Sequence, residues 1–290
     1  MVDVIIPIYN ARAFLPYVLM SIACQEVTCD FLVTLVDDAS SEKYDDIIKK
    51  FQDSISIKYL RLDVNSGAGV ARQFALDNTK NPYIIFIDVD DLFYNADSIE
   101  KLFSNIELGY DVVCGMQYNE IIDAEFINEG DLHGKIYRRE FLLKQKIRFN
   151  DTRFHEDNYF HNCVMVANAK AYNLEEPVYI YCNNDCSTTK ISNSTEFERL
   201  PILLSNVKSI IDQYPVTKDN IDRLTDFLLY KYRYYNRIYK KFNISQKKQF
   251  TDWLNYYDKD NIDLLGIDDN DDLYNSIYSK LEIKINKVSN

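Results

Sequence analysis

Short apolar runs alternate with segments of helical spacing along the first half of the chain. The runs Val2–Ile8, Phe31–Val36 and Tyr83–Ile87 contain few polar residues, which predicts strands buried on both faces. A helix that packs against these strands is predicted by apolar residues at spacings of three and four: Leu15, Val18, Leu19 and Ile22. Strands that alternate with helices in this way are typical of an α/β fold with a mostly parallel sheet.

Three further segments predict strands from weaker signals. The segment Ile55–Leu62 alternates between apolar and polar positions, which indicates a strand nearer the edge of the sheet. Asp111–Tyr118 and Glu176–Cys182 predict two more strands later in the chain. The pattern between those two segments fits no single element clearly.

Helix signals divide the chain into two regions. One helix is expected to begin near Val70, and another near Asp97, where Glu100 three residues later resembles a capping box and Gly109 stops the helix. From about Ser194 helical spacing dominates to the end of the chain. We therefore predict an α/β domain over residues 1–193, with halves 1–117 and 118–193, and a helical C-terminal region over 194–290.

Three carboxylates follow directly on the apolar run Tyr83–Ile87, at Asp88, Asp90 and Asp91. A buried strand that ends in clustered acids is unfavourable unless a cation or a cationic substrate lies beside them. Oxygen ligands without nearby histidine or thiolate suit Mg²⁺ or Mn²⁺ better than zinc. The sequence thus predicts a metal site here, with a solvated acidic turn as the alternative.

Polar residues also follow the first two predicted strands. Tyr9 and Asn10 come after the first strand, and Asp37 and Asp38 end the second. In open parallel sheets the ligand lies beyond the carboxyl ends of the strands. We therefore expect three strand ends to carry polar groups towards one crevice.

The turn after the first strand cannot be a glycine-rich phosphate cradle, because the first glycine of the chain is Gly67. This excludes a Rossmann fingerprint and a P-loop at that turn, since each needs glycine where the backbone approaches phosphate. A bound diphosphate would then have to be neutralised by a metal ion, and the Asp88–Asp91 cluster can hold one.

The composition of the chain limits the classes of binding partner and the cellular location that can be expected for the protein. The formal net charge of −12 opposes general attraction to nucleic acid. No apolar run approaches the ~18 residues needed to span a bilayer, and the N-terminal stretch lacks a signal-peptide core, so the expected location is cytoplasmic. Six scattered cysteines favour reduced thiols.

The basic segment Tyr230–Phe242 contains no acid, and it is either a helix with packed tyrosines or a surface for an anionic polymer or membrane.

Four segments, in their order and spacing, resemble the family 2 glycosyltransferases of the GT-A fold. They are Val4–Asn10, Val36–Ser40, Asn65–Arg72 and Asp88–Asp91. The resemblance covers roughly residues 1–190 and implies a Rossmann-like, mostly parallel sheet flanked by helices. It also implies an inverting transfer of a sugar from a nucleotide-diphosphate donor, a UDP-sugar by default, to a hydroxyl acceptor such as a glycan or surface polymer.

The resemblance implies roles for individual residues on the donor side. Asp88 and Asp90 match the Asp-x-Asp acids that hold Mn²⁺ or Mg²⁺ on the donor diphosphate, whereas Asp38 matches a nucleobase contact and Arg72 a nucleotide contact. The implied donor site consists of Pro7, Tyr9, Asn10, Asp38, Asn65, Gly67, Arg72, Asp88, Val89 and Asp90. The chain departs from the family at Gln73 and Ala75, where Asn and Gly are common.

A second motif lies at His155–Phe160, which resembles the family's Glu-Asp-x-x-Phe motif. The resemblance implies that Asp157 is the general base, the carboxylate that takes the acceptor hydroxyl proton in an inverting transfer. Glu156 would orient the acceptor or the metal, and an acidic helix start is the alternative for both. Further candidate acceptor contacts are His133, Lys135, Arg138, Asp91 and His155, and then Tyr179, Tyr181, Ser187 and Thr188.

Other sites and functions stay open at this point. A zinc site from His155, His161 and Cys163, extended by Cys182 and Cys186, is disfavoured because no tight Cys-x-x-Cys pair is present. The main rival function is a catalytically silent module that binds a sugar nucleotide or glycan, although both acidic motifs favour an enzyme. A nucleotidyltransferase is disfavoured by the missing early glycines.

Overall fold

The computed structural model describes residues 1–127, 130–184, 196–214, 217 and 224. The chain divides into two compact units, Met1–Ile191 and Ser192–Asn290, beside the boundary expected at residues 193 and 194. In the second unit the structure describes one helix, α7 (Glu196–Gln213). The basic segment Tyr230–Phe242 lies outside the described residues.

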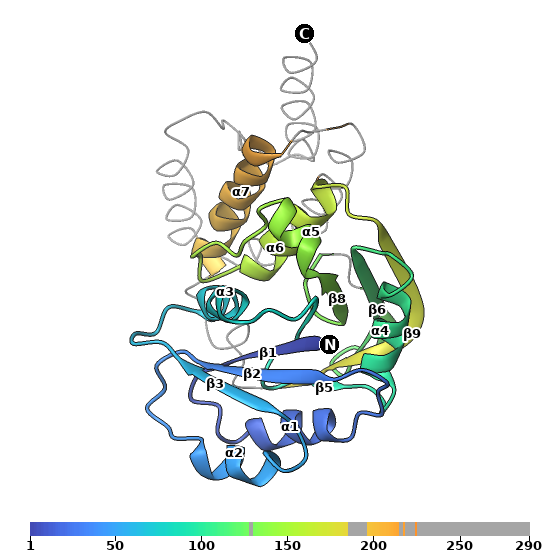
Figure 1. Ribbon diagram of the computed structural model, residues 1–290. Helices are drawn as coiled ribbons and strands as arrows, with labels where there is room; N and C mark the ends of the chain where they lie inside the picture. Colours follow the sequence, from blue (N-terminus) through green and yellow to red (C-terminus); the bar gives the residue numbers. More distant parts are fainter. Residues whose placement is uncertain (128–129, 185–195, 215–216, 218–223, 225–290) are drawn as a thin grey trace. The chain divides into compact units, whose positions relative to one another are not determined.

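One sheet forms the centre of the first unit (Figure 1). Its strands run in the order β3-β2-β1-β4-β8-β6-β9-β5, and β7 pairs with β6 beside this path. The strands are β1 (Val2–Ile8), β2 (Phe31–Asp37), β3 (Ile57–Arg61), β4 (Tyr83–Phe86), β5 (Leu92–Phe93), β6 (Val112–Asn119), β7 (Ala124–Phe126), β8 (Lys135–Arg138) and β9 (Ala171–Tyr181).

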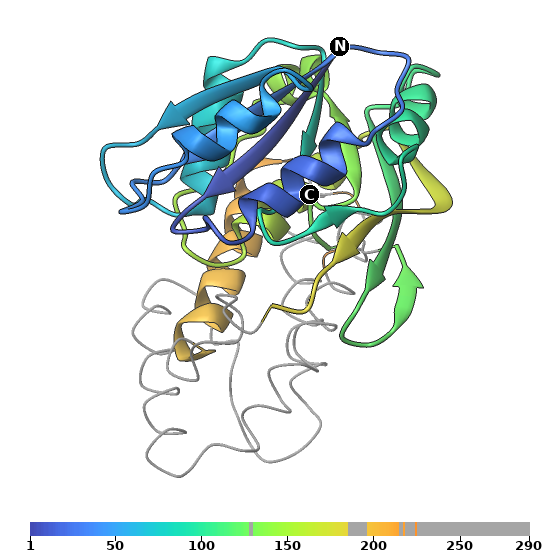
Figure 2. The ribbon, with the colours of Figure 1, turned by 90° about the horizontal axis from the view of Figure 1, so that it is seen from below.

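The direction of the strands changes in the middle of the sheet. β3, β2, β1 and β4 are parallel neighbours, but β8 runs antiparallel to both β4 and β6. β9 lies parallel to β6, and the two run side by side in Figure 2. Ile85 pairs with Ile136, so β8 begins at the carboxyl end of β4 and ends at its amino end. The expected α/β class is confirmed. The strands β3, β2, β1 and β4 form one continuous parallel block, and β6 and β9 form a second parallel pair beyond the antiparallel strand β8.

Helices cover both faces of the parallel strands. α1 and α2 lie on one face of β1–β3, and α3 lies on the other (Figure 1). All seven residues of β1 are therefore buried, and this explains its nearly continuous apolar sequence. The helices of this unit are α1 (Leu15–Ala23), α2 (Asp45–Phe51), α3 (Ala68–Asn78), α4 (Ser98–Ile106), α5 (Arg139–Lys144) and α6 (Glu156–Val166).

Most sequence predictions for the first half are confirmed. β1 has the predicted bounds, β2 is one residue longer, and β3 is the edge strand that its alternating pattern indicated. The four apolar residues predicted to face the sheet are the buried residues of α1. β9 is longer than predicted because it begins at Ala171.

The predicted capping box is wrong in its contacts. α4 begins directly after Asp97, but the Asp97 side chain makes no capping hydrogen bond and pairs with Lys101 Nζ at 3.2 Å. Glu100 does not reach back to the helix start, because its Oε2 accepts a hydrogen bond from Thr28 N at 2.7 Å. The predicted start of the helix is therefore confirmed. The predicted contacts within the capping box are absent, and Glu100 instead binds Thr28, which is distant in sequence.

In the part of the chain that the structure describes, no helix is both long enough and apolar enough to cross a membrane.

Candidate active site

A buried arginine joins two of the predicted motifs. Arg72 on α3 donates from Nη2 to Asp88 Oδ1 at 2.6 Å and from Nη1 to Glu156 Oε1 at 3.0 Å. Asp88 lies just beyond β4, and Glu156 is the first residue of α6. Arg72 is only 2% exposed, so its charge is shared between these two carboxylates. The structure thus brings the predicted metal motif and the predicted base motif to one place.

A second cation approaches Asp88 from the segment before β8. His133 Nε2 lies 3.1 Å from Asp88 Oδ2, an ion-pair distance, although the contact is not aligned as a hydrogen bond. Burial alone would lower the pKa of His133, but the charges of Asp88 and Asp131 outweigh this and raise it well above its usual value. Burial alone would raise the pKa of Asp88, yet His133 and Arg72 hold it far below its ordinary range. Both oxygens of Asp88 therefore face cationic groups.

His133 is itself supported by a polar group beneath the site. Asp131 Oδ2 lies 3.9 Å from His133 Nδ1, and Asp131 Oδ1 lies 3.5 Å from Lys135 Nζ. Gln117 on β6 donates from Nε2 to Asp131 Oδ1 at 3.0 Å and to the His133 carbonyl at 2.8 Å. Lys135 is fully buried. Its buried position favours a role in holding Asp131, and it does not favour the predicted role of Lys135 as an acceptor contact.

Asp90 and Asp91 differ in how many hydrogen bonds their carboxylates already accept. Asp91 is buried, and it accepts hydrogen bonds from Tyr179 Oη at 2.5 Å and from Cys182 N at 2.9 Å. Asp90 is half-buried, and among the described residues it accepts one side-chain hydrogen bond, from Asn184 Nδ2 at 2.9 Å. Burial and then the charge of Asp88 raise the pKa of both carboxyls. A cation beside them would relieve this unfavourable concentration of negative charge.

The three acids fit a divalent cation that prefers oxygen ligands. Asp88, Asp90 and Asp91 each place one oxygen within 4.8 Å of the others. Asp88 and Asp91 have both oxygens engaged, so Asp90 has the greatest remaining capacity to bind an ion. Over the described ranges this is the one cluster of potential ligands, and His161 instead contacts Tyr137 Oη through Nδ1 at 3.1 Å. The site therefore fits Mg²⁺ or Mn²⁺ and gives no support to the zinc alternative.

Asp157 stands next to this group with its carboxylate unengaged. It is the second residue of α6 and half-buried, and it has no hydrogen bond or ion pair to any residue that the structure describes. Its charge acts on Arg72, and together with burial it raises the pKa of Glu156. His155, with φ of 61°, precedes the helix and contacts Asn158 Oδ1 through Nδ1 at 3.0 Å. A carboxylate without a partner is free to accept a proton from a substrate.

The loop that follows β2 is tied to the turn before α3. Asp38 accepts hydrogen bonds from Ser66 N at 2.7 Å and Gly67 N at 2.8 Å, and its carbonyl accepts from Asn65 Nδ2 at 3.4 Å. Gly67 has φ of 93°, which favours glycine. The predicted nucleobase contact of Asp38 stays a prediction, and the structure gives this carboxylate a role in holding the turn.

Other predicted donor residues lie along the same edge of the sheet. Tyr9 is 51% exposed at the end of β1. Asn10 Oδ1 accepts a hydrogen bond from Ser41 N at 2.9 Å, which links the loops after β1 and β2. Pro7 pairs with Val36 in the sheet, and Val89 lies between the metal-site acids. Their contacts with a donor stay predictions.

Two predicted residues are not part of this group. Asp37 is fully buried, and it binds Ser40 N, Tyr59 Oη and Arg61 instead of facing the crevice. Arg138 lies at the amino end of β4 and donates to the carbonyls of Tyr110 and Ile106. Tyr179 does belong to the group, because its buried hydroxyl donates to Asp91 Oδ2 and its ring centre lies 5.4 Å from that of His133. The remaining candidates Ser187, Thr188 and Cys186 lie outside the described residues.

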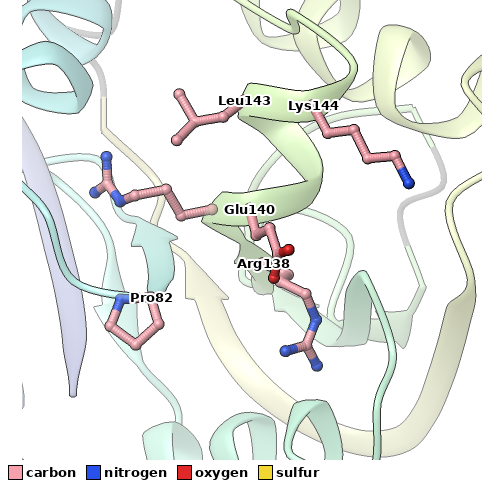
Figure 3. Close-up of a pocket in the computed structure, with 6 residues that line it drawn as sticks. Pro82, Arg138, Glu140, Leu143 and Lys144 are labelled. Atoms are coloured by element: carbon pink, nitrogen blue, oxygen red, sulfur yellow. The ribbon is translucent and has the colours of Figure 1, made fainter.

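A hollow of about 550 Å³ lies at the opposite end of β4 from the acids. Figure 3 shows it beside α5, where Pro82, Arg138, Glu140, Leu143 and Lys144 surround it. The guanidinium of Arg138 is already bonded to main-chain carbonyls. That of Arg139, which also lines the hollow, binds Asp3 and Thr79. These two arginines stabilise the fold, and their existing partners occupy the guanidinium groups that line the hollow.

Asp131 and Gln117 belong to the site but were not predicted from the sequence. Asp131, His133 and Lys135 occupy alternate positions, but residues 131–134 form a bend and a turn in which Gly134 has φ of 65°, so the alternation of a strand does not apply to them. The spacing therefore gave no valid signal that Asp131 accompanies His133. Gln117 carried no such signal, because its contacts depend on the pairing of β6 with β8.

Ala39 in the loop after β2 provides a test of strain beside the site. Its φ of 58° is unfavourable for a residue with a Cβ atom. We expect Ala39→Gly to increase the free energy of unfolding by about 0.5–1 kcal/mol, because relief of strain exceeds the entropy gained by the unfolded chain. Denaturant unfolding measures the change. Ala13→Gly, at an exposed residue without positive φ, is the control and should lower stability; equal losses in both variants would contradict the prediction.

The chain matches a family model and several curated proteins. The model described as Glycosyl transferase family 2 matches residues 3–171. TarS of Staphylococcus aureus, a poly(ribitol-phosphate) beta-N-acetylglucosaminyltransferase, is 31% identical over 100 residues, which are 34% of this chain and 17% of TarS. TarP of Staphylococcus aureus, which has the same enzyme name, is 24% identical over 289 residues, covering 89% of this chain and 87% of TarP. The chain thus aligns with a small part of TarS and with most of TarP.

Solved structures share the fold. The crystal structure of TarS residues 1–349 in complex with UDP-GlcNAc has a TM-score of 0.76 and 19% identity, covering 88% of this chain and 80% of that one. The mannosyltransferase PcManGT from Pyrobaculum calidifontis, in complex with GDP-Man and Mn²⁺, has a TM-score of 0.60 and 13% identity, covering 88% of this chain and 73% of that one. These likenesses confirm the expected GT-A fold.

Proposed function

The chain belongs to glycosyl transferase family 2, and on this premise we propose that it transfers a sugar from a nucleotide-diphosphate donor to a hydroxyl acceptor with inversion at the anomeric carbon. A UDP-sugar is the proposed donor, because UDP-GlcNAc is the ligand of the TarS complex with the same fold. The carrying observation is the position of Asp157, which lies beside Glu156, while Arg72 links Glu156 to Asp88. One site then offers a place for the diphosphate and a carboxylate for the acceptor.

The proposed reaction needs two groups on opposite sides of the anomeric carbon. Asp157 takes the proton of the acceptor hydroxyl while that oxygen forms a bond to the anomeric carbon, and the bond between this carbon and the diphosphate oxygen breaks. Asp90, with Asp88 and Asp91, would hold Mg²⁺ or Mn²⁺ on the diphosphate. When bound, the ion offsets the negative charge of the leaving group. Holding the two substrates in this orientation supplies much of the rate.

We propose a hydroxyl group of a surface polymer as the acceptor. TarS and TarP are both named for transfer to poly(ribitol-phosphate), and this supports a polymer as the substrate class. His155 and Asp157 are half-buried at the start of α6, so the acceptor would approach them there. A role for the basic segment Tyr230–Phe242 in docking such a polymer stays a prediction.

Donor binding and product identity together test the proposed function. We expect one UDP-sugar with Mn²⁺ to raise the melting temperature by about 5 °C or more at a hundred times its Kd, because a ligand that binds only the folded state stabilises it. Removal of Mn²⁺ with a chelator should abolish most of this shift. Incubation with that donor should release nucleoside diphosphate. Release of pyrophosphate would instead indicate a nucleotidyltransferase, and donor binding without turnover would indicate a silent module.

A further inference from the structure

Arg72 is placed to connect the two halves of the proposed reaction. Its two terminal nitrogens bind carboxylates from different parts of the chain, Asp88 after β4 and Glu156 at the start of α6. Glu156 directly precedes Asp157, the proposed base. We propose that Arg72 is a positioning residue that fixes the start of α6, and with it Asp157, relative to the metal-site carboxylate Asp88. The proposal rests on the proposed function and assigns Arg72 a different role from the nucleotide contact that the resemblance implies.

The surroundings of Arg72 do not favour a direct donor contact. The residue is only 2% exposed, and the guanidinium carbon lies 5.9 Å from the centre of the Phe149 ring. The third nitrogen, Nε, is buried without a hydrogen-bond partner among the described residues. The planar guanidinium therefore has no free edge towards solvent. The two terminal nitrogens donate in fixed directions, and they thereby set the distance between Asp88 and Glu156.

The positive charge of Arg72 also helps to fix the distance between Asp88 and the start of α6. Asp88, Glu156 and Asp157 all act on the charge of Arg72. Without a cation between them, these carboxylates would repel each other in a partly buried site. The start of α6 would then move away from Asp88, because its acids lie at the end of a helix and not within the sheet.

The contact between α3 and α6 is too close for even one additional carbon atom. A Cβ atom at Gly69, one turn before Arg72, would lie 2.7 Å from Glu156 Cγ, 2.9 Å from Glu156 Cβ and 3.1 Å from the Asn150 carbonyl. Glu156 therefore has to occupy a defined place against α3. Gly69→Ala would displace Glu156 without removing any charged group, so it tests position separately from charge.

Arg72→Lys is the primary test. Lysine keeps the positive charge but offers a single ammonium, so it cannot hold both carboxylates in the same fixed directions. We expect kcat to fall up to ~10²-fold, as small displacements of catalytic groups do. The Kd of the UDP-sugar with Mn²⁺, measured by calorimetry, should change less than ~3-fold. Gly69→Ala should likewise lower kcat and leave Kd nearly unchanged. It provides a second variant if Arg72→Lys does not fold.

Arg148→Lys is the matched control. Arg148 also pairs with a carboxylate of α3, since its Nη1 and Nη2 bind Asp77 at 3.0 and 2.7 Å. This pair is exposed, and Asp77 lies five residues beyond Arg72 on α3. The same substitution at this position should leave kcat and Kd unchanged.

Amide hydrogen exchange tests the positioning role without depending on turnover. We expect Arg72→Lys to increase exchange at the first hydrogen-bonded amides of α6, those of Tyr159 and Phe160, while the rest of α6 keeps its protection. Unchanged exchange at these residues would overturn the proposal. A large loss of donor affinity with kcat retained would also overturn it, because Arg72 would then be a donor contact. A wild-type protein that binds donor without turnover would reject the proposed function alone, and the exchange result would still decide the role of Arg72.

Discussion

Asp157→Asn should lower kcat by ~10²–10⁴-fold while the Kd of the nucleotide-sugar donor stays near that of the wild type. Asparagine has the shape of aspartate but cannot take a proton from the acceptor hydroxyl at neutral pH. Asp157 makes no hydrogen bond or ion pair within the described part of the chain, so the substitution should not disturb the fold. Steady-state kinetics with saturating donor and acceptor measures kcat, and calorimetry measures Kd.

A nearby acid provides the control for Asp157. Asp151 is exposed in the segment before α6, and Asp151→Asn removes the same charge without touching the proposed base. This variant should keep kcat within about 2-fold of the wild type, since surface charges act weakly at a distance. Near-normal kcat in Asp157→Asn would refute the assignment of the base. It would leave the family membership and the donor site unaffected.

Asp90→Ala should abolish the effect of Mn²⁺ on donor binding. In the presence of Mn²⁺ we expect donor affinity to fall at least ~10²-fold, because Asp90 is the acid with the most capacity to bind the ion. Without Mn²⁺ the wild type and the variant should bind the donor equally weakly. Titrations of the UDP-sugar with and without Mn²⁺, at constant ionic strength, measure both values.

Asp97→Ala is the control for Asp90. Asp97 lies in the same connection between β4 and α4, but it is 52% exposed and pairs with Lys101. Its removal should leave the response to Mn²⁺ unchanged. If Asp90→Ala retains the full Mn²⁺ response, then Asp90 is not a metal ligand, and Asp88 or Asp91 would have to bind the ion despite their existing partners.

The acidic motif could be predicted from the sequence because its signal is local. A continuous apolar run followed at once by Asp88, Asp90 and Asp91 identifies both the buried strand and the polar group at its end. The order of four such segments then sufficed for the fold and the family. The partners of these acids could not be predicted in the same way. Arg72 contacts residues 16 and 84 positions away, and such contacts depend on how α3 and α6 meet.

Two pairs of candidate residues that are close in sequence lie apart in the structure, and each separation has a physical explanation. Asp37 and Asp38 are adjacent in sequence, but Asp37 ends β2 and binds Tyr59 Oη, whereas Asp38 lies in the loop beyond it and binds the turn before α3. These partners are distant in sequence, so adjacency alone could not assign the two carboxylates. Arg138 and Lys135 are close in sequence, but they stand at opposite ends of the short strand β8. The antiparallel direction of β8 was not predicted, and without it the two ends could not be assigned.

The charges gathered around Arg72 also bear on the order in which ligands arrive. Among the residues that the structure describes, this site gathers six carboxylates and three basic side chains. The carboxylates are those of Asp88, Asp90, Asp91, Asp131, Glu156 and Asp157, and the basic side chains are Arg72, His133 and Lys135. A bare pyrophosphate group would meet a repulsive field here. The nucleotide should therefore enter already chelated to its cation, and the free magnesium or manganese level around the protein would set how much of the donor pool it can use.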